Sequence, residues 1–508
     1  MTDNSVAQER VFAFLTDPGS HPGMARIDTH AASVFLEGER ALKIKRAVRF
    51  PFLDYSTLEK RKSACEEEIR INRPFAPQIY RRVVAITEGC DGSLTVGGHG
   101  TPIEYAVEMS RFDENRTLDH LAKAGPFSID LTTGIADAIL ASHVIAPRVD
   151  AIPWIEAIPS LINGNTEGLQ RGGHFATAEI KELAGATHRA FAQLRPTLEE
   201  RGRQGFVRRC HGDLHLANIV LIDEKPVLFD AIEFDPKIAS ADVFYDLAFT
   251  LMDLLHYEQH QAANLLLDRY LATSSPKNLD AIGALPLFMS MRAGIRAQVL
   301  LAKPKHPRSD QAGIAEEARG YFNLARALID PPAPRLVAIG GLSGTGKSVL
   351  ARMLAPTIPP QPGAVVLRSD VVRKQLFEVK DTDRLPSSAY RPDVTERVYE
   401  TLARRARHVL TQGCSVVIDA VFARESERRA VATLARVCGA PFTGLFLTTE
   451  LATRQARIGK RQGDASDATE EVAALQERYH ISDISWTIID ASGTPEQTLK
   501  RTRIAIDR

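Results

Sequence analysis

The residues best suited to chemistry lie between Gly341 and Ser348, which fit the pattern G-x-x-x-x-G-K-[ST] at every fixed position. Glycines let the backbone curl so that several N–H groups point inward, and a following helix adds the positive end of its dipole. In this pattern Lys347 reaches the β- and γ-phosphates of a nucleoside triphosphate, and the Ser348 hydroxyl ligates Mg²⁺. The predicted nucleotide-binding residues are Gly341, Leu342, Ser343, Gly344, Thr345, Gly346, Lys347 and Ser348.

The sequence on each side of this loop supports the prediction. Residues 336–339 form an apolar run of the length of a buried parallel strand, and the apolar residues after Ser348 recur at helical spacing. A glycine-rich turn could fit the pattern by chance. The strand before it and the helix after it are the context in which the pattern binds phosphates.

Two further apolar runs in this region end in a carboxylate. The run from Val365 ends at Asp370, and the run from Ser415 ends at Asp419. At the C-terminal edge of a parallel sheet, Asp370 is well placed to accept a proton from a substrate hydroxyl, although it could also cap the helix that follows. Asp419 has the form of a carboxylate that supports Mg²⁺ or its water.

Arginines follow the next expected strand, at 444–448. Arg454, Arg457 and Arg461 lie on an expected helix, where Arg457 and Arg461 are four residues apart and share a face. A mobile segment of this kind can close over a triphosphate and stabilise transition-state charge. An exposed basic helix is the alternative.

A separate polar cluster surrounds an expected hairpin, with strands at 219–222 and 227–229. Asp213 and Asn218 precede the first strand, and Asp230 follows the second. This arrangement is typical of phosphoryl transfer, because one carboxylate takes or orients the substrate hydroxyl while the Asn and the other Asp hold Mg²⁺. Two alternatives stay open. His211, Asp213 and His215 could ligate zinc, which would leave Asn218 and Asp230 without a role, or the loop could simply be packed by its own hydrogen bonds.

Lys43 and Lys45 lie on one face of an expected strand at 41–45, which pairs with a strand at 33–36. A helix is expected over 56–73, with Ser56 as its N-cap, and Glu66, Glu67 and Glu68 lie in its second half. One of these carboxylates could pair with a strand lysine beside a nucleotide. An edge-strand lysine and a solvated helix face are the ordinary alternatives.

The chain has 508 residues, so two or three domains are expected. Three prolines within 331–334 form a stiff spacer and divide the chain into domains at 1–330 and 335–508. In the first domain, strands at 80–87 and 104–109 complete a small mixed lobe, and a larger helical lobe follows from Ser128, with breaks expected at the prolines at 147, 153 and 159. The second domain predicts a parallel sheet flanked by helices. The predicted fold class is therefore α/β and α+β.

Composition limits the partners and the compartment. Lys plus Arg equals Asp plus Glu, at 63 each, so no global basic field attracts nucleic acid. The five cysteines form no C-x-x-C pattern, which argues for free thiols and a reducing compartment. No apolar run reaches the roughly eighteen residues of a membrane span, and the polar N-terminus is unlike a signal peptide. We expect a cytoplasmic protein without a membrane partner.

The segment HGDLHLAN, followed by LFDAIEF, resembles the catalytic signature of the aminoglycoside phosphotransferase family, a branch of the protein-kinase-like fold. The resemblance covers most of residues 25–300 and implies a bilobal domain. It implies that Asp213 is the catalytic base, that Asn218 and Asp230 are magnesium ligands, and that Asp246 is structural.

The same resemblance makes Lys43 the nucleotide-binding lysine and Glu68 its helix partner, with Lys45 and Glu67 still open. It places the adenine near residues 108–110. The sequence departs from the pattern because it has no G-x-G-x-x-G, so the phosphate loop would be the short turn at 29–33.

Residues 335–508 resemble the zeta-toxin, gluconate-kinase and shikimate-kinase group of P-loop kinases. The order of the two domains resembles a bacterial family that fuses an aminoglycoside phosphotransferase-like domain to a P-loop kinase domain. The resemblances imply a phosphotransferase with two sites for ATP and Mg²⁺, each acting on a hydroxyl of a sugar-like or aminoglycoside-like small molecule. The predicted catalytic residues are Asp213 at one site and Lys347, Asp370, Arg457 and Arg461 at the other.

Two other functions stay open. One domain could sense a ligand and regulate the other without catalysis of its own. The P-loop domain could instead act on a nucleotide or nucleic-acid hydroxyl, which its arginines permit and the balanced net charge does not support.

Overall fold

The computed structural model describes residues 3–50, 53–302, 311–380, 382–460, 465–479, 481 and 484–506. The chain forms two compact units. Unit 1 contains Met1–Leu161 and Leu198–Tyr257, and unit 2 contains Ile162–Thr197 and Glu258–Arg508. Among the described helices, none is long and apolar enough to cross a membrane.

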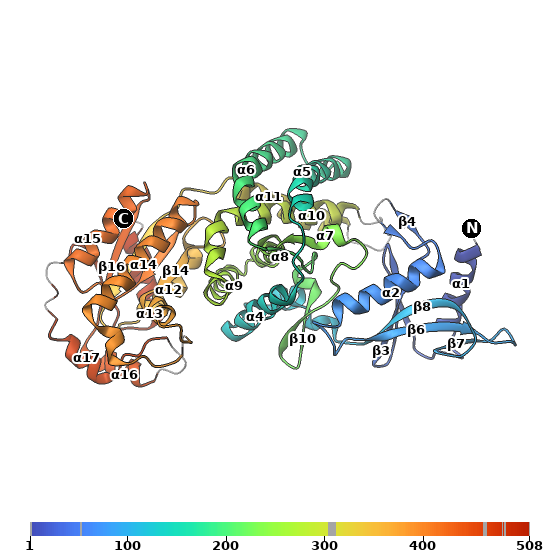
Figure 1. The fold of residues 1–508 in the computed structure, drawn as a ribbon, viewed down its shortest axis with the longest axis horizontal. Coiled ribbons are helices and arrows are strands. Elements are labelled where there is room, and N and C mark those ends of the chain that lie inside the picture. The colour runs from blue at the N-terminus through green and yellow to red at the C-terminus, as the bar shows by residue number, and fades with distance from the viewer. Residues whose placement is uncertain are drawn as a thin grey trace. The chain divides into compact units, whose positions relative to one another are not determined.

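Unit 1 contains a six-stranded antiparallel sheet in the order β1-β2-β3-β8-β6-β7. Figure 1 labels β3, β6, β7 and β8 of this sheet. Its strands are β1 (Ala25–Asp28), β2 (Ala32–Glu37), β3 (Arg40–Lys45), β6 (Tyr80–Glu88), β7 (Leu94–Val96) and β8 (Thr101–Ser110). The predicted hairpin is confirmed, because β2 and β3 pair from Ala32 opposite Lys45 to Glu37 opposite Arg40. The strands predicted at 80–87 and 104–109 correspond to β6 and β8.

Side-chain alternation gives the two faces of this sheet different partners. Leu42 and Ile44 pack in one cluster with Phe12 of α1 (Asp3–Leu15). The other face meets α2 (Leu58–Asn72), whose Cys65 packs with Val107 of β8. Lys43 and Lys45 therefore face α2. The N-cap of α2 is Thr57, whose side chain accepts from the Lys60 N–H, so the predicted cap at Ser56 was one residue early.

The remaining elements of unit 1 carry or support the polar loop after Cys210. Two of its small sheets are the hairpin β10-β11 and the pair β12-β9. The elements are β4 (Arg49–Phe50), β5 (Leu53–Asp54), η1 (Glu114–Arg116), α3 (Leu118–Ala124), α4 (Ile129–Ile145), β9 (Val207–Arg209), η2 (Leu216–Asn218), β10 (Ile219–Ile222), β11 (Lys225–Leu228), α7 (Pro236–Ala239), β12 (Ser240–Asp242) and α8 (Val243–His256).

Two long helices cross from one unit into the other. They are α5 (Ile152–Gly172) and α6 (Thr177–Arg203). The break predicted at Pro159 is wrong, since α5 continues through this residue. The helices that follow in unit 2 are α9 (His260–Thr273), η3 (Pro276–Ala284), α10 (Leu285–Ala302) and α11 (Gln311–Ile329).

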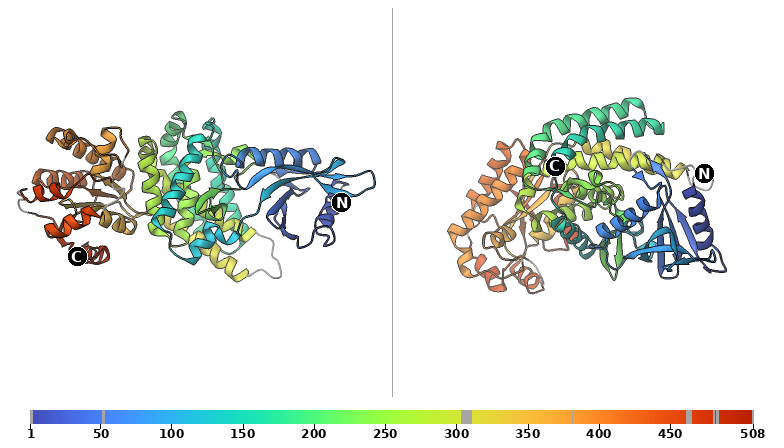
Figure 2. Two further views of the ribbon diagram at one scale, coloured as in Figure 1. Left: turned by 90° about the horizontal axis from the view of Figure 1, so that it is seen from below. Right: turned by 45° about the vertical axis from the view of Figure 1, so that its right-hand side comes forward.

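The C-terminal part of unit 2 is built on a five-stranded parallel sheet in the order β14-β15-β13-β16-β17. The strands are β13 (Leu336–Gly341), β14 (Val365–Arg368), β15 (Val416–Asp419), β16 (Phe442–Thr448) and β17 (Thr487–Asp490). Helices lie on both sides of the sheet (Figure 2). They are α12 (Lys347–Leu354), η4 (Ala355–Thr357), α13 (Ser369–Leu376), η5 (Ser387–Tyr390), α14 (Pro392–Thr411), α15 (Glu425–Val437), α16 (Leu451–Gly459), α17 (Glu470–Gln476) and α18 (Pro495–Ile506).

The predicted mixed fold class is confirmed by these two kinds of sheet. An apolar run such as that of β13, buried at all six positions, is what a central parallel strand requires. The edge strand β14 is covered by α9, because the Val366 N–H donates to Asp268 Oδ1 at 3.2 Å and the Asn264 side chain donates to the Ala364 carbonyl at 3.0 Å.

Candidate active sites

The glycine-rich loop connects β13 to α12 in a left-handed backbone conformation that side chains disfavour. Gly344 has φ of +87° and Gly346 has φ of +95°. A Cβ atom on Gly344 would lie 2.7 Å from the carbonyl oxygen of Arg454. Glycine at 344 therefore allows the loop to pack directly against the backbone of α16.

Ser348 and Asp419 meet at the C-terminal end of the sheet. Parallel pairing places Asp419 of β15 opposite Ile339 of β13, just before the loop. Ser348 Oγ donates to Asp419 Oδ2 at 2.5 Å. Lys347 Nζ donates to the Leu342 carbonyl at 3.1 Å, so its ammonium lies against the loop.

Arg368 joins this pair and was not among the predicted site residues. Its Nη2 donates to Ser348 Oγ at 3.1 Å, and its Nε lies 3.4 Å from Asp419 Oδ2. The available signal was its position at the end of β14, two residues before Asp370. A serine hydroxyl and a carboxylate are donors that suit Mg²⁺. Ser348 Oγ and Asp419 Oδ2 therefore suit a Mg²⁺ ion. An ion bound between these oxygens would displace Arg368 from both of them.

Asp370 lies in the first turn of α13, and the N-cap of that helix is Arg368. The open alternative that Asp370 is itself the cap is therefore wrong. Burial raises the pKa of Asp370 above its ordinary value, the negative charge of Asp419 raises it further, and Lys347 and Arg368 oppose the rise. A carboxyl with a raised pKa beside the predicted phosphate-binding residues is suited to proton transfer.

The predicted arginines have different positions. Arg454 is buried and donates from Nε to the Ser343 carbonyl at 2.8 Å and from Nη2 to the Ala473 carbonyl at 3.0 Å, so it ties the loop to α17. Arg457 donates from Nη2 to the carbonyls of Ala491 and Gly493, each at 2.8 Å, and lines the cavity over the loop. Arg461 lies outside the described residues.

Gln476 of α17 also contacts the loop, and sequence analysis missed it. The Ser343 N–H donates to Gln476 Oε1 at 2.7 Å, and Gln476 Nε2 donates to Ser343 Oγ at 3.0 Å. Because no motif marks this glutamine, only tertiary packing could reveal it.

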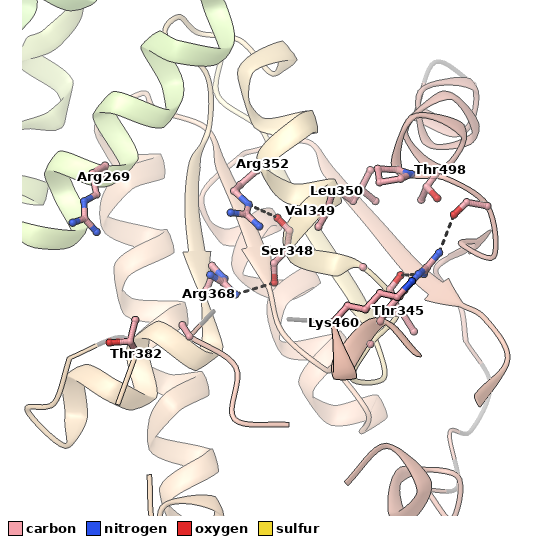
Figure 3. A pocket seen from close by; sticks show the side chains of 16 residues that line it. Arg269, Thr345, Ser348, Val349, Leu350, Arg352, Arg368, Thr382, Lys460 and Thr498 are labelled. Atoms are coloured by element: carbon pink, nitrogen blue, oxygen red, sulfur yellow. Dashed lines mark hydrogen bonds between the residues drawn. The ribbon is translucent and has the colours of Figure 1, made fainter. Parts of the chain in front are cut away.

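A cavity of about 610 Å³ opens over the loop (Figure 3). Basic side chains dominate its polar lining. The lining residues include Arg269, Arg352, Arg368, Arg457 and Lys460 together with Thr345, Gly346 and Ser348 of the loop and first helical turn.

In unit 1, Lys43 lies between two carboxylates that are far apart in sequence. Its Nζ lies 2.8 Å from Glu68 Oε1 and 2.6 Å from Asp230 Oδ1. Burial lowers the pKa of Lys43, but Asp230 and Glu68 outweigh burial and hold it well above its ordinary value. The structure therefore brings the predicted lysine, helix glutamate and metal-ligand candidate together.

The open alternatives at this position are distinguished by their contacts. Lys45 Nζ lies 2.6 Å from Glu68 Oε2 and also pairs with Glu233, but it has no described contact with Asp230. Glu67 pairs instead with Arg70, on an exposed part of α2. Glu68 is thus the glutamate that faces the sheet.

Asp213 and Asn218 lie together in the loop before β10. Asn218 Nδ2 donates to the Asp213 backbone carbonyl at 2.9 Å and to Asp213 Oδ2 at 3.1 Å. Asp246 of α8 supports this loop by accepting the N–H groups of His211, at 3.2 Å, and Gly212, at 2.8 Å. The loop geometry is therefore held from the helix behind it.

The zinc alternative is wrong for the described residues. The only described group of His, Cys, Asp and Glu atoms close enough to share a metal is His143, Cys210 and Asp246. It does not include His211, whose Nε2 lies 2.9 Å from the Phe229 carbonyl and whose Nδ1 accepts the Asp213 N–H at 3.4 Å. Both ring nitrogens of His211 are thus engaged by the backbone.

Comparison with known proteins supports the assignment of the C-terminal part. Residues 336–480 match the family described as the AAA domain. Relatives over nearly the whole chain are uncharacterized proteins of Mycobacterium bovis and Mycobacterium tuberculosis, 27% identical over 487 residues that cover 93% of this chain and 93% of each relative. The family match includes the whole glycine-rich loop and the strands β13, β14, β15 and β16.

Solved structures with similarity include two kinds of kinase. A choline/ethanolamine kinase family protein from Mesorhizobium loti is 14% identical, with a TM-score of 0.36, and the match covers 64% of this chain and 95% of that one. A gluconokinase from Sinorhizobium meliloti is 16% identical, with a TM-score of 0.25, and the match covers 34% of this chain and 95% of that one.

Proposed function

We propose that the chain is an ATP- and Mg²⁺-dependent phosphotransferase with two nucleotide sites, one in each unit. Each site transfers the γ-phosphoryl group to a hydroxyl of a small molecule that is sugar-like or aminoglycoside-like. The observation that carries the proposal is the arrangement of Lys347, Ser348 and Asp419 around the glycine-rich loop, with Asp370 close by. This combination supplies phosphate contacts, oxygen donors for a cation and a proton acceptor.

At the P-loop site, the backbone of the loop and Lys347 bind the phosphates, and Arg457 contacts the nucleotide from α16. Ser348 and Asp419 would hold Mg²⁺, whose charge would neutralise that of the phosphates. Asp370 takes the proton of the acceptor hydroxyl as the new phosphate ester forms and ADP leaves. The raised pKa of Asp370 makes it a stronger base than an ordinary aspartate.

At the unit 1 site, Lys43 orients the phosphates and is itself held by Glu68. Asn218 and Asp230 are the proposed metal ligands, and Asp213 accepts or orients the acceptor hydroxyl. The Lys43–Asp230 contact and the Asp213–Asn218 contact support these roles, because they bring all four side chains to the mouth of one hairpin.

The test is a search for phosphorylated products. Wild type, Asp213→Ala and Lys347→Ala proteins are incubated with a bacterial metabolite extract, ATP and Mg²⁺, and mass spectrometry identifies species that gain one phosphate. Two active sites predict two sets of products, each lost in only one variant. If only Lys347→Ala loses products, unit 1 is a recognition module and the two-site proposal is wrong.

A further inference from the structure

Helix α9 reaches the P-loop cavity although it lies outside the segment that matches the AAA domain. Its residue Arg269 lines the cavity together with Arg352 of α12 and Arg368 of β14. The P-loop fold alone therefore does not complete this cavity.

The position of Arg269 is set by its neighbours on the same helix. Asp268 accepts the Val366 N–H at 3.2 Å, and Asn264 donates to the Ala364 carbonyl at 3.0 Å. The backbone of Gly363 lies so close to the Asn264 side chain that a Cβ atom on Gly363 would lie 2.8 Å from Asn264 Nδ2. These contacts attach α9 to β14, which leads directly to Arg368 and Asp370.

The basic residues divide into two groups around Ser348. In the view of Figure 3, Arg269, Arg352 and Arg368 lie on one side of Ser348, and Lys460 and Thr345 lie on the other. Arg457 contacts the loop backbone, because its Nη1 donates to the Thr345 carbonyl at 3.4 Å. The first side includes Arg368, which is two residues from Asp370 and opposes the rise of its pKa. In the proposed function Asp370 takes the proton of the acceptor, so we assign this side as the acceptor end of the cavity.

Three guanidinium groups line this end of the cavity, and one of them, that of Arg368, also faces Asp419. None of the described residues that line the cavity is acidic. Guanidinium groups bind carboxylates and phosphates through two parallel N–H bonds, so Arg is suited to recognise either group. A neutral polyol would gain nothing from this charge.

We propose that the acceptor of the P-loop site carries a phosphate or carboxylate in addition to the reacting hydroxyl. Arg269 of α9 binds this anionic group together with Arg368. This inference rests on the proposed function of the P-loop site. In the transfer, the bond from the γ-phosphorus to ADP breaks, the bond to the acceptor oxygen forms, and the hydroxyl proton passes to Asp370. The anionic group held by Arg269 does not react.

The test uses the full chain with Asp213→Ala, so that transfer reports the P-loop site. The probes are matched sets that differ in charge: glycerol, glycerate and glycerol 3-phosphate, and glucose, gluconate and glucose 6-phosphate. The proposal expects transfer to a charged member with kcat/KM at least tenfold above its neutral partner. Comparison of the carboxylate probes with the phosphate probes identifies which of the two anionic groups the site recognises.

Arg269→Ala should raise KM for the charged acceptor at least tenfold and leave KM for ATP unchanged. Arg269→Lys should recover part of the loss, since it restores charge without the paired N–H bonds. Arg429→Ala, which removes an exposed arginine of α15, is the matched control and should change neither value.

Equal or better transfer to the neutral members would overturn the proposal, as would an Arg269→Ala effect confined to KM for ATP. Absence of transfer to every member while the protein still binds ADP would overturn the proposed acceptor class. Failure of wild type to bind ADP, measured by calorimetry, would instead contradict the proposed function itself.

Discussion

Lys43 and Lys45 lie two residues apart on β3 and share Glu68, yet their other partners give them different expected roles. Lys43 contacts Asp230 at the mouth of the hairpin, whereas Lys45 contacts Glu233 and its side chain is only 3% exposed. A lysine at the mouth can exchange its contact for a phosphate. A fully enclosed lysine contributes to the stability of unit 1.

Lys43→Met should lower phosphoryl transfer by unit 1 by roughly 100-fold or more, because it removes a cation that faces the developing charge. Lys45→Met should instead lower the free energy of unfolding by about 3 kcal/mol, because it removes the buried cation that pairs with Glu233 and with Glu68. Product formation in the Lys347→Ala background and urea unfolding separate the two effects. If both variants lost phosphoryl transfer equally and neither lost stability, the assignment of a catalytic role to Lys43 and a structural role to Lys45 would be wrong.

Asp370 predicts a pH dependence for the P-loop site. Its pKa is raised by burial, so the active carboxylate form is gained at higher pH than for an ordinary aspartate, and activity should rise as pH rises through the shifted pKa. Arg368 lowers this pKa. Arg368→Ala should therefore move the acidic limb of the kcat profile to higher pH.

The measurement is kcat against pH at saturating ATP and acceptor. Arg429→Ala, which removes an exposed arginine of α15, should keep the wild-type profile. A profile that moves to lower pH in Arg368→Ala would show that Arg368 does not stabilise the ionised form of Asp370.

At the scale of elements, the loop between β13 and α12 depends on close packing against α16. Gly344→Ala should weaken nucleotide binding roughly tenfold, because an alanine at this φ costs of order 1–3 kcal/mol and its Cβ meets the Arg454 backbone. Gly164→Ala, in α5, has no atom within 4 Å of the added Cβ and should leave binding unchanged. Calorimetric titration of both variants with ADP checks this.

Helix α9 predicts a pH-dependent stability through Asp268. Burial raises the pKa of this carboxyl to about 8, from 3.8. The native state then retains a proton that the unfolded chain loses, so the stabilisation is present at low pH and is lost as pH rises from about 4 to about 8, at a slope of at most about 1.4 kcal/mol per pH unit. Above that range the effect is constant.

Asp268→Asn keeps an oxygen that accepts the Val366 N–H and removes the titration. Urea midpoints between pH 5 and pH 9 should therefore fall with pH more steeply in wild type than in Asp268→Asn. Parallel curves for the two proteins would mean that Asp268 titrates with an ordinary pKa.

Local patterns in the sequence predicted the elements that carry local chemistry. The strand, loop and helix around Lys347 are contiguous, so spacing alone located them, and the β2–β3 hairpin followed from alternation. The helix break predicted at Pro159 was wrong, because a helix that is stabilised by tertiary packing tolerates a proline that helix propensity alone would exclude. Arg269 and Gln476 could not be predicted, since Arg269 lines the cavity and Gln476 contacts Ser343 of the loop only through the packing of helices that are distant in sequence.

At the scale of the whole molecule, the domain boundary at 330–335 stays a prediction, and a pair of fragments tests it. The fragment 335–508 alone would expose the edge strand β14 and leave Val366 and Ala364 without their α9 partners. Two lost hydrogen bonds correspond to about 2 kcal/mol, or roughly 4–8 °C in Tm for a domain of this size. The fragment 162–508, which contains both segments of unit 2, should recover that difference, and equal Tm values would make 335–508 an independent domain.

The division of the chain also has a consequence for its synthesis. Unit 1 is complete once Tyr257 has left the ribosome, so it can fold while the rest is being translated. Unit 2 takes Ile162–Thr197 from the earlier part of the chain and Glu258–Arg508 from the later part. At ordinary translation rates, its first segment waits on the order of ten seconds or more for the partners that bury it. During translation, the apolar surface of Ile162–Thr197 is therefore exposed in the middle of the nascent chain, and this segment is where we expect chaperones to bind.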